Sequence, residues 1–419
     1  MSTIMQSRQI AAIDIGTTKI CVLIAAVNAL GKLEILGIGQ HPSYGLKKGV
    51  IVNIGLAVES IQKAVKEAEA SAGIKIHSAA VGISGGHIQS FNSTGVVAIK
   101  RRDVTQDDID RVVEAAKAVP IPQDREILHV IPQYFRVDGQ ELVQDSLGMF
   151  GVRLEAQVHI VTGAVCSAQN IIKSCELAGV AATDIVLEQI ASADAVLTAS
   201  ERSLGVGIID IGGGTSDFAL YKDSKIRHSK VVPVAGNHFT NDLAIGLAIP
   251  IKEAEELKRF YGFVLEDKYF EYNCDKVEVN LGYDNVSKQV DIYSIYEVLN
   301  SRAQEVFDLV EEEIQRFHLK PLMPTGIVLT GGGALLNGIR ELAQEKFKVP
   351  VRIGIPSYFK DPTDRAAMPD MLKSPIYSTA YGLLLHAAHT TQASFGVNEV
   401  DPMLVKVFKR MKSWITDFL

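Results

Sequence analysis

The chain has 419 residues, of which 47% are hydrophobic and 22% charged, so it can form more than one hydrophobic core and does not have the composition of a disordered protein. Its net charge of −7 excludes a general nucleic-acid binder, which needs a basic surface to neutralise phosphates. The four cysteines have no C-x-x-C or metal-ligand spacing and are interpreted as reduced, mostly buried thiols. The N-terminus lacks a signal-peptide pattern, and the longest apolar run, Ile20–Val27, is too short to span a bilayer. We therefore expect a cytoplasmic chain.

Strands and one helix are predicted up to Ser84. The apolar segment 10–26 is expected to form two strands around a turn at 16–19, and the segment 33–39 a third. Apolar residues at helical spacing predict a helix over 56–72, and the segment 78–84 returns as a buried strand. The next segment, up to about residue 160, resembles a separate insertion. It is expected to contain a hairpin-like stretch at 93–100, a helix capped by Thr105 and Asp108, and several strands.

Strands and helices alternate after the insertion. The predicted elements are a helix within 166–179, a strand at 184–190, a helix at 191–199, a strand-turn-strand unit at 206–221, helices from Asn237 to Tyr261 broken at Pro250, a hairpin around 283–285, a long helix at 294–318, and a strand-turn-helix unit at 325–347. This alternation predicts an α/β architecture.

The tetrapeptide Ile-Asp-Ile-Gly occurs twice, and each copy ends an apolar strand with an aspartate and begins a polar turn. Glycine lets backbone N–H groups approach anionic oxygens, and the strand that follows each turn excludes a Walker-type loop. A buried aspartate needs a cation or donor. Asp14 and Asp210 are therefore expected to hold hydrated Mg²⁺ against a triphosphate. The turn residues expected to contact the phosphates are Gly16, Thr17, Thr18, Lys19, Gly212, Gly213, Gly214, Thr215 and Ser216. The alternative is two unrelated glycine turns with capping aspartates, which the repeat and a third glycine run disfavour.

The segments "IDIGTTKI", "IDIGGGTSDFAL" and "IVLTGGGALLNGI" resemble the phosphate 1, phosphate 2 and adenosine motifs of the actin, heat-shock-chaperone and sugar-kinase ATPase superfamily. The resemblance implies two duplicated, ribonuclease-H-like α/β lobes that close on ATP. It also implies nucleotide contacts from Gly236, Asn237, Glu255, Lys258, Gly331, Gly332 and Gly333. For Glu255 and Lys258, a solvent-exposed charged helix face is the alternative that local sequence favours.

The connection from His41 to Asn53 is too short for actin's extra subdomain, and the insertion instead follows "SAAVGIS". This position, with "LHVIPQ" and "VHIVTG", resembles the FtsA family of bacterial cell-division proteins, in which subdomain 1C replaces actin's 1B. The implied divisions are 1–84, 162–198 and 357–392 for subdomain 1A, 85–161 for 1C, 199–238 and 301–356 for 2A, 239–300 for 2B, 393–402 for a flexible linker, and 403–419 for an amphipathic membrane-targeting helix.

The final segment combines an apolar helical stripe with basic flanks, a pattern typical of a helix that lies in a membrane interface. Its expected membrane-binding residues are Leu404, Val407, Phe408, Lys409, Arg410, Met411, Lys412, Trp414, Ile415 and Phe418. The alternative is a helix docked on the protein core. Each basic residue contributes roughly 1 kcal/mol near an anionic leaflet.

The family resemblance implies a filament-forming, ATP-binding scaffold on the inner face of the cytoplasmic membrane at the division site. It implies binding of the FtsZ C-terminal peptide by subdomain 2B, with Arg302 as a candidate contact or an ordinary exposed arginine. Later division proteins are expected to bind residues 85–161. Gap-free alignment places Ser167 where bacterial actins have a water-orienting glutamate, so at most weak ATPase activity is expected. A pilus-assembly adaptor and a small-molecule kinase are the alternatives.

Overall fold

The computed structural model describes residues 8–28, 33–140, 142–272, 274–282, 286–357 and 368–393. Two five-stranded sheets have the same strand order. The first lobe contains β10 (Ala181–Leu187), β6 (Ser78–Ile83), β1 (Arg8–Ile15), β2 (Lys19–Val27) and β3 (Leu33–Pro42), and the second contains β17 (Val351–Ile353), β16 (Ile327–Thr330), β11 (Val206–Ile211), β12 (Ser216–Lys222) and β13 (Lys225–Val232). In each sheet three antiparallel strands are followed by two parallel ones. The predicted duplicated α/β fold is confirmed.

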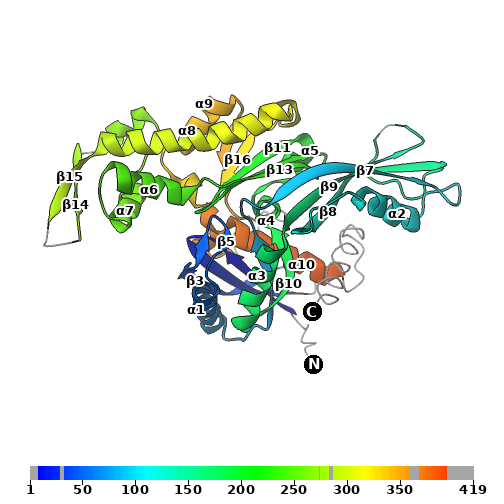
Figure 1. The fold of residues 1–419 in the computed structure, drawn as a ribbon, viewed down its shortest axis with the longest axis horizontal. Coiled ribbons are helices and arrows are strands. Elements are labelled where there is room, and N and C mark those ends of the chain that lie inside the picture. Colours follow the sequence, from blue (N-terminus) through cyan, green and yellow to red (C-terminus); the bar gives the residue numbers. More distant parts are fainter. Residues whose placement is uncertain are drawn as a thin grey trace.

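The inner strands β1, β2, β6, β11 and β16 are buried along almost their whole length because helices cover both faces of each sheet. On the outer face of the first sheet pack α1 (Ile54–Ala72) and α3 (Val165–Leu177). Between the two sheets lie α4 (Glu188–Val196) and α10 (Ser378–Ala393). The outer face of the second sheet is covered by α6 (Gly236–Gly246), α8 (Ile292–Arg316) and α9 (Ile339–Phe347). The molecule is thus built in layers, with α4 and α10 in the middle (Figure 1).

The insertion has its own sheet and core. Its strands follow the order β7 (Gln89–Ala98), β9 (Arg153–Ala164), β8 (Arg125–Val137), and α2 (Gln106–Lys117) packs on them. The predicted capping box of Thr105 and Asp108 is present. The hairpin expected at 93–100 is wrong, because these residues continue one long strand, β7, that pairs with β9.

The remaining elements are two helices, a hairpin and several short segments. The helix expected from Asn237 to Tyr261 is broken before Pro250 into α6 and α7 (Ile251–Tyr261), as predicted. The predicted hairpin is present as β14 (Lys276–Asn280) and β15 (Ser287–Asp291), while its turn at 283–285 lies outside the described residues. Short elements are β4 (Leu46–Lys47), β5 (Val50–Ile51) and α5 (Ala199–Leu204). The strand predicted at 184–190 instead ends at Leu187, and α4 begins at Glu188.

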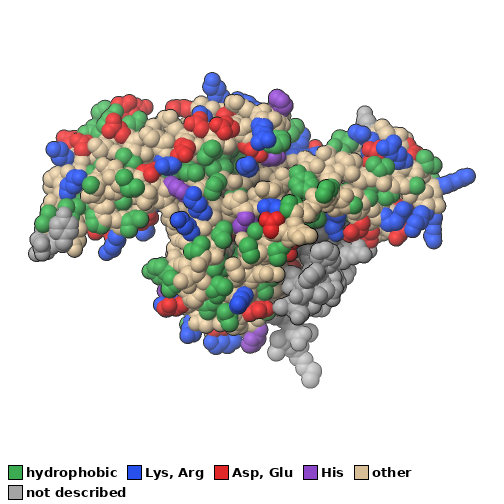
Figure 2. Space-filling model, viewed as in Figure 1, with side chains coloured by type: hydrophobic (Ala, Val, Ile, Leu, Met, Phe, Trp, Pro, Cys, Tyr) green, Lys and Arg blue, Asp and Glu red, His purple; other side chains and the backbone are tan. Residues whose placement is uncertain are grey.

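Charged side chains of both signs are mixed over the visible surface, with hydrophobic ones scattered among them (Figure 2). In the described part of the chain, no helix has both the length and the hydropathy needed to cross a bilayer. All four cysteines are free, but only Cys21 and Cys175 are buried, so the expectation of mostly buried thiols holds for half of them.

Gly382 tests the contact between α4 and α10. A Cβ at this position would overlap the backbone carbonyl of Ala191. Overpacking of this kind costs about 1–3 kcal/mol, so Gly382→Ala is expected to lower the thermal midpoint by about 1–3 °C in calorimetry. The matched control is Gly55→Ala in α1, where a Cβ meets only the Asn53 side chain and helix propensity favours alanine. An unchanged midpoint in Gly382→Ala would contradict the close packing of these helices.

Candidate functional site

The two Ile-Asp-Ile-Gly turns lie against each other. A Cβ on Gly213 would overlap the side chain of Thr18, and one on Gly214 would overlap that of Thr17. The Thr17 hydroxyl accepts a hydrogen bond from the backbone N–H of Gly49 at 2.9 Å, which fixes the first turn to the β4–β5 loop. The structure therefore brings the predicted Gly16–Lys19 and Gly212–Ser216 segments into one site, and glycine is required where the turns touch.

Four carboxylates surround this site. Asp14 and Asp210 occupy matching positions near the ends of β1 and β11, and both are buried. Asp217, on β12, is paired across the hairpin with Asp210. Glu188 is the first residue of α4, and its side chain lies against Gly82. The sequence analysis predicted Asp14 and Asp210 but missed Asp217 and Glu188.

Asp210 is held by two hydroxyl groups from the helices between the sheets. Ser192 of α4 and Thr379 of α10 both donate to its Oδ2 atom, the latter at 3.1 Å. The two hydroxyl oxygens are also 3.0 Å apart. Burial raises the pKa of Asp210, although both hydrogen bonds favour its charged form. The α4–α10 contact thus positions the Asp210 carboxylate of the second lobe.

Asp217 connects the second lobe to the start of the insertion. Ser84, which directly follows β6, donates to both carboxylate oxygens of Asp217, at 3.0 and 2.8 Å. Burial, together with the nearby Asp210, raises the pKa of Asp217 to about 8. Without a cation, this carboxyl group therefore keeps its proton near neutral pH.

Lys19 is the cation nearest Asp14. Its Nζ atom lies 3.8 Å from Asp14 Oδ2, donates to the Ile376 carbonyl at 2.7 Å and stacks over the Tyr377 ring. Burial raises the pKa of Asp14 to about 6 despite Lys19, and Asp210 adds to the rise. Burial and the three aspartates also raise the pKa of Glu188 well above its ordinary value. One lysine does not balance four carboxyl groups, so the site favours an added cation or protons.

A metal ion here would be bound through water. Among the described residues, no group of three or more histidine, cysteine or acidic side chains is close enough to hold a metal ion together. Mg²⁺ keeps several waters and uses one or two carboxylates, so the arrangement fits a hydrated ion better than a directly coordinated one.

The first turn of α6 is tied to the second glycine turn. The N–H groups of Gly236 and Asn237 donate to the carbonyls of Gly212 and Gly213, at 3.0 and 2.7 Å. Lys258 of α7 donates to the Gly236 carbonyl at 3.1 Å and to Glu255 at 2.6 Å, and both side chains are half-buried. Burial lowers the pKa of Lys258, against the opposing effect of Glu255. The Lys258 side chain is 16% exposed, so the alternative of an exposed charged helix face is wrong for Lys258, whereas Glu255 keeps 42% of its side chain exposed.

The third glycine run packs against β11. Gly331 has φ +83°, and a Cβ there would overlap the Asp210 carboxylate. A Cβ on Gly333 would overlap Ile211, whereas Gly332 has open space around it. Gly331 and Gly333 thus allow the chain to approach the strand that carries Asp210.

The remaining predicted residues are Ser167, Arg302 and those of the C-terminal segment. Ser167 is buried in the first turn of α3, which packs on the outer face of the first sheet. In the described part of the chain, it forms no hydrogen bond with any of the four carboxylates of the site. Arg302 of α8 forms ion pairs with Asp242 and Glu305. The ten predicted membrane-binding residues and the predicted linker beyond residue 393 lie outside the described residues.

Asp217→Asn tests the protonation of the acidic cluster. The pKa of Asp217 is about 8 in the folded state and ordinarily 3.8, so between these pH values the folded state binds more protons and this group's contribution to stability falls as pH rises. In chelator, the thermal midpoint of the parent protein is expected to fall between pH 6 and 8.5 by at least about 2 °C more than that of Asp217→Asn. Asp267→Asn, at an exposed position between α7 and β14, is the control. Equal pH slopes for parent and Asp217→Asn would contradict the interpretation.

Solved structures with the same fold include the PilM-PilN type IV pilus biogenesis complex, with a TM-score of 0.65 at 17% identity, covering 90% of this chain and 98% of that one. MreB5 of Spiroplasma citri bound to ADP has a TM-score of 0.54 at 16% identity, with 93% and 99% coverage. At these identities the likeness shows the fold alone. It confirms the expected two-lobed, actin-like architecture.

Sequence comparison is more specific. Residues 85–162 match the profile described as the SHS2 domain inserted in FTSA, and residues 207–382 match that of Cell division protein FtsA. Proteins named Cell division protein FtsA are 44% identical in Pseudomonas aeruginosa (99% of each chain covered), 41% in Neisseria meningitidis (98% of each) and 35% in Escherichia coli K12 (97% of each). The chain therefore belongs to the FtsA family of cell division proteins.

Proposed function

We propose that this protein binds Mg–ATP between its lobes, polymerises on the inner face of the cytoplasmic membrane and anchors FtsZ filaments there at the division site. The observation that carries the nucleotide part is the contact between the two glycine turns, with four carboxyl groups around them, three of them buried and that of Glu188 half-buried. The family to which the chain belongs supports the cell-division role.

The residues present fit a magnesium nucleotide. Backbone N–H groups of the two turns and the Lys19 ammonium would meet the phosphates, as in other glycine-lined anion sites. Asp14 and Asp210 would hold the waters of the ion, which supplies charge neutralisation for the phosphates. On the nucleoside side we place Glu255, Lys258, Gly236, Asn237 and the Gly331–Gly333 run.

We propose that ATP serves mainly as a clamp. Ser167 is a poor base at neutral pH, and burial raises the pKa of both Asp217 and Glu188, the two other acidic groups of the site. Binding energy would then favour the closed arrangement of the lobes and filament formation, with slow or absent hydrolysis. A single-turnover assay that measures phosphate release from bound ATP tests this. The small-molecule kinase alternative requires phosphoryl transfer to a substrate, and the same assay with added substrates detects that transfer.

Asp210→Asn is expected to weaken Mg–ATP binding at least tenfold, because it removes one of two carboxylates proposed to hold the hydrated ion. The measurement is titration with a fluorescent ATP analogue, with and without chelator. Chelation should weaken binding to the parent protein much more than to Asp210→Asn. Asp267→Asn is again the control, and equal metal dependence in all three proteins would exclude this site.

We propose that the segment 403–419 is the membrane anchor. The protein as a whole is acidic, with a net charge of −7, so the basic residues of this segment form a local positive region. One such helix binds a membrane reversibly, so a filament with many copies is expected to bind more tightly than a monomer.

The FtsZ C-terminal peptide is proposed to bind residues 239–300, and later division proteins are proposed to bind the 85–161 insertion. Arg302 could meet an acidic group of the FtsZ peptide only by exchanging its ion pairs with Asp242 and Glu305. The pilus-adaptor alternative has the same fold, but the family assignment disfavours it.

Deletion of residues 403–419 is expected to abolish sedimentation with anionic vesicles and to leave ATP binding unchanged. FtsZ should pellet with vesicles only when the full-length protein is present. Vesicles of neutral lipid are the control for the electrostatic contribution. A truncated protein that still pellets with anionic vesicles would show that the anchor lies elsewhere in the chain.

A further inference from the structure

Two sheet edges face each other where the insertion meets the second lobe. β7 is the outer strand of the insertion sheet, and β13 is the outer strand of the second-lobe sheet. Side chains bridge them: Ser90 donates to the Ser229 carbonyl at 2.7 Å, and Asn92 to the Arg227 carbonyl at 3.3 Å. Neither strand forms a backbone ladder with the other in the described chain. Gln133 of β8 also donates to the Ile226 and Arg227 carbonyls, at 2.8 and 3.2 Å, so side chains of the insertion occupy the edge of β13 up to Ser229.

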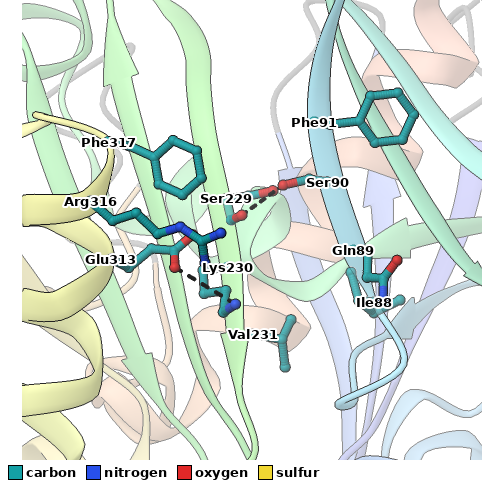
Figure 3. A pocket seen from close by; sticks show the side chains of 10 residues that line it. All are labelled: Ile88, Gln89, Ser90, Phe91, Ser229, Lys230, Val231, Glu313, Arg316 and Phe317. Atoms are coloured by element: carbon teal, nitrogen blue, oxygen red, sulfur yellow. Dashed lines mark hydrogen bonds and ion pairs between the residues drawn. The ribbon is translucent and has the colours of Figure 1, made fainter.

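A groove opens beyond the Ser90–Ser229 bridge. It has a volume of about 390 Å³ and lies between Ile88–Phe91 of the insertion and Ser229–Val231 of β13, with the end of α8 as its third wall (Figure 3). Phe91 and Phe317 stand on opposite sides of it and are 39% and 47% exposed. The volume falls in the range of small binding sites, and the two rings offer apolar contact on both sides.

The charges of the groove leave one cation without a counter-ion. Glu313 accepts from His228 Nε2 at 2.8 Å and lies 3.7 Å from the Lys230 ammonium, so its charge is balanced within the protein. Arg316 stacks on the Phe317 ring at 5.4 Å, and no ion pair is recorded for its guanidinium group among the described residues. An arginine fork next to apolar walls is suited to a carboxylate.

We propose that this groove binds a short extended segment of a partner protein, with apolar side chains between Phe91 and Phe317 and an acidic side chain on Arg316. One unpaired cation is too little for a nucleic acid or a membrane surface, which need many basic contacts. The groove contains none of the residues assigned to nucleotide, membrane or FtsZ binding, so it can bind a peptide even if those assignments fail. Its residues Ile88–Phe91 belong to the insertion proposed to bind later division proteins, and the inference rests on that part of the proposed function.

Peptide selection tests the proposal directly. Random peptides displayed on phage are selected on the full-length protein and counter-selected on Arg316→Gln. We expect enrichment of peptides that combine Asp or Glu with aliphatic or aromatic residues. In fluorescence anisotropy, Arg316→Gln and Phe91→Ala should each weaken the selected peptide about tenfold. Arg259→Gln, an exposed arginine in the last turn of α7, is the matched control and should change nothing.

Hydrogen exchange locates the bound peptide. Protection is expected in residues 88–91 and 229–231, with or without ATP and vesicles. Failure to select any peptide that distinguishes the parent protein from Arg316→Gln would overturn the proposal, as would protection confined to other segments. Protection of 229–231 that rises with protein concentration alone would show that a second copy covers the groove, which also overturns it.

Discussion

The contact between the two glycine turns determines how the rest of the molecule is arranged. Thr17 and Thr18 of the first lobe fill the space that side chains on Gly213 and Gly214 would need. Because the turns touch, the carboxylates that end β1 and β11 come from different lobes yet lie in one low-dielectric site. Burial and mutual repulsion raise the pKa values of Asp14, Asp217 and Glu188. The fold thus gathers acidic groups where protons or an incoming cation must compensate their charge.

The sequence predicted the parts of the site that follow local rules. Asp14 and Asp210 each end an apolar strand and begin a glycine turn, and the repeat of that unit indicated two equivalent hairpins. Glu188 was missed because α4 has no side-chain cap: Leu187 occupies the N-cap position, so no Ser, Thr, Asp or Asn marks the helix start. Asp217 was missed because one aspartate in a strand does not reveal which neighbours the fold gives it.

The errors in the fold prediction also have physical causes. The Ser-Thr-Gly segment in β7 suggested a turn, but Gly95 is there because a Cβ would overlap the Val112 carbonyl of α2. Glycine can report close packing as well as a bend. The charged residues Glu255 and Lys258 suggested an exposed helix face, because the sequence of α7 does not show which helix packs beside it. In the structure that neighbour is α6, and its Gly236 carbonyl and Thr240 hydroxyl accept hydrogen bonds from Lys258. Tertiary contacts decided each of these cases.

The middle layer of helices has a mechanical consequence. The buried residues around α4 and α10 form a continuous core that includes Ala12 and Leu23 of the first sheet and Ile208 and Ala219 of the second. Separating the lobes by more than a slight rotation would expose this shared core to water and lose its close packing. The two lobes therefore share one hydrophobic core and do not behave as independent domains joined by a linker. A rotation between them that keeps this core packed is small in angle, and it displaces most the segments farthest from α4 and α10.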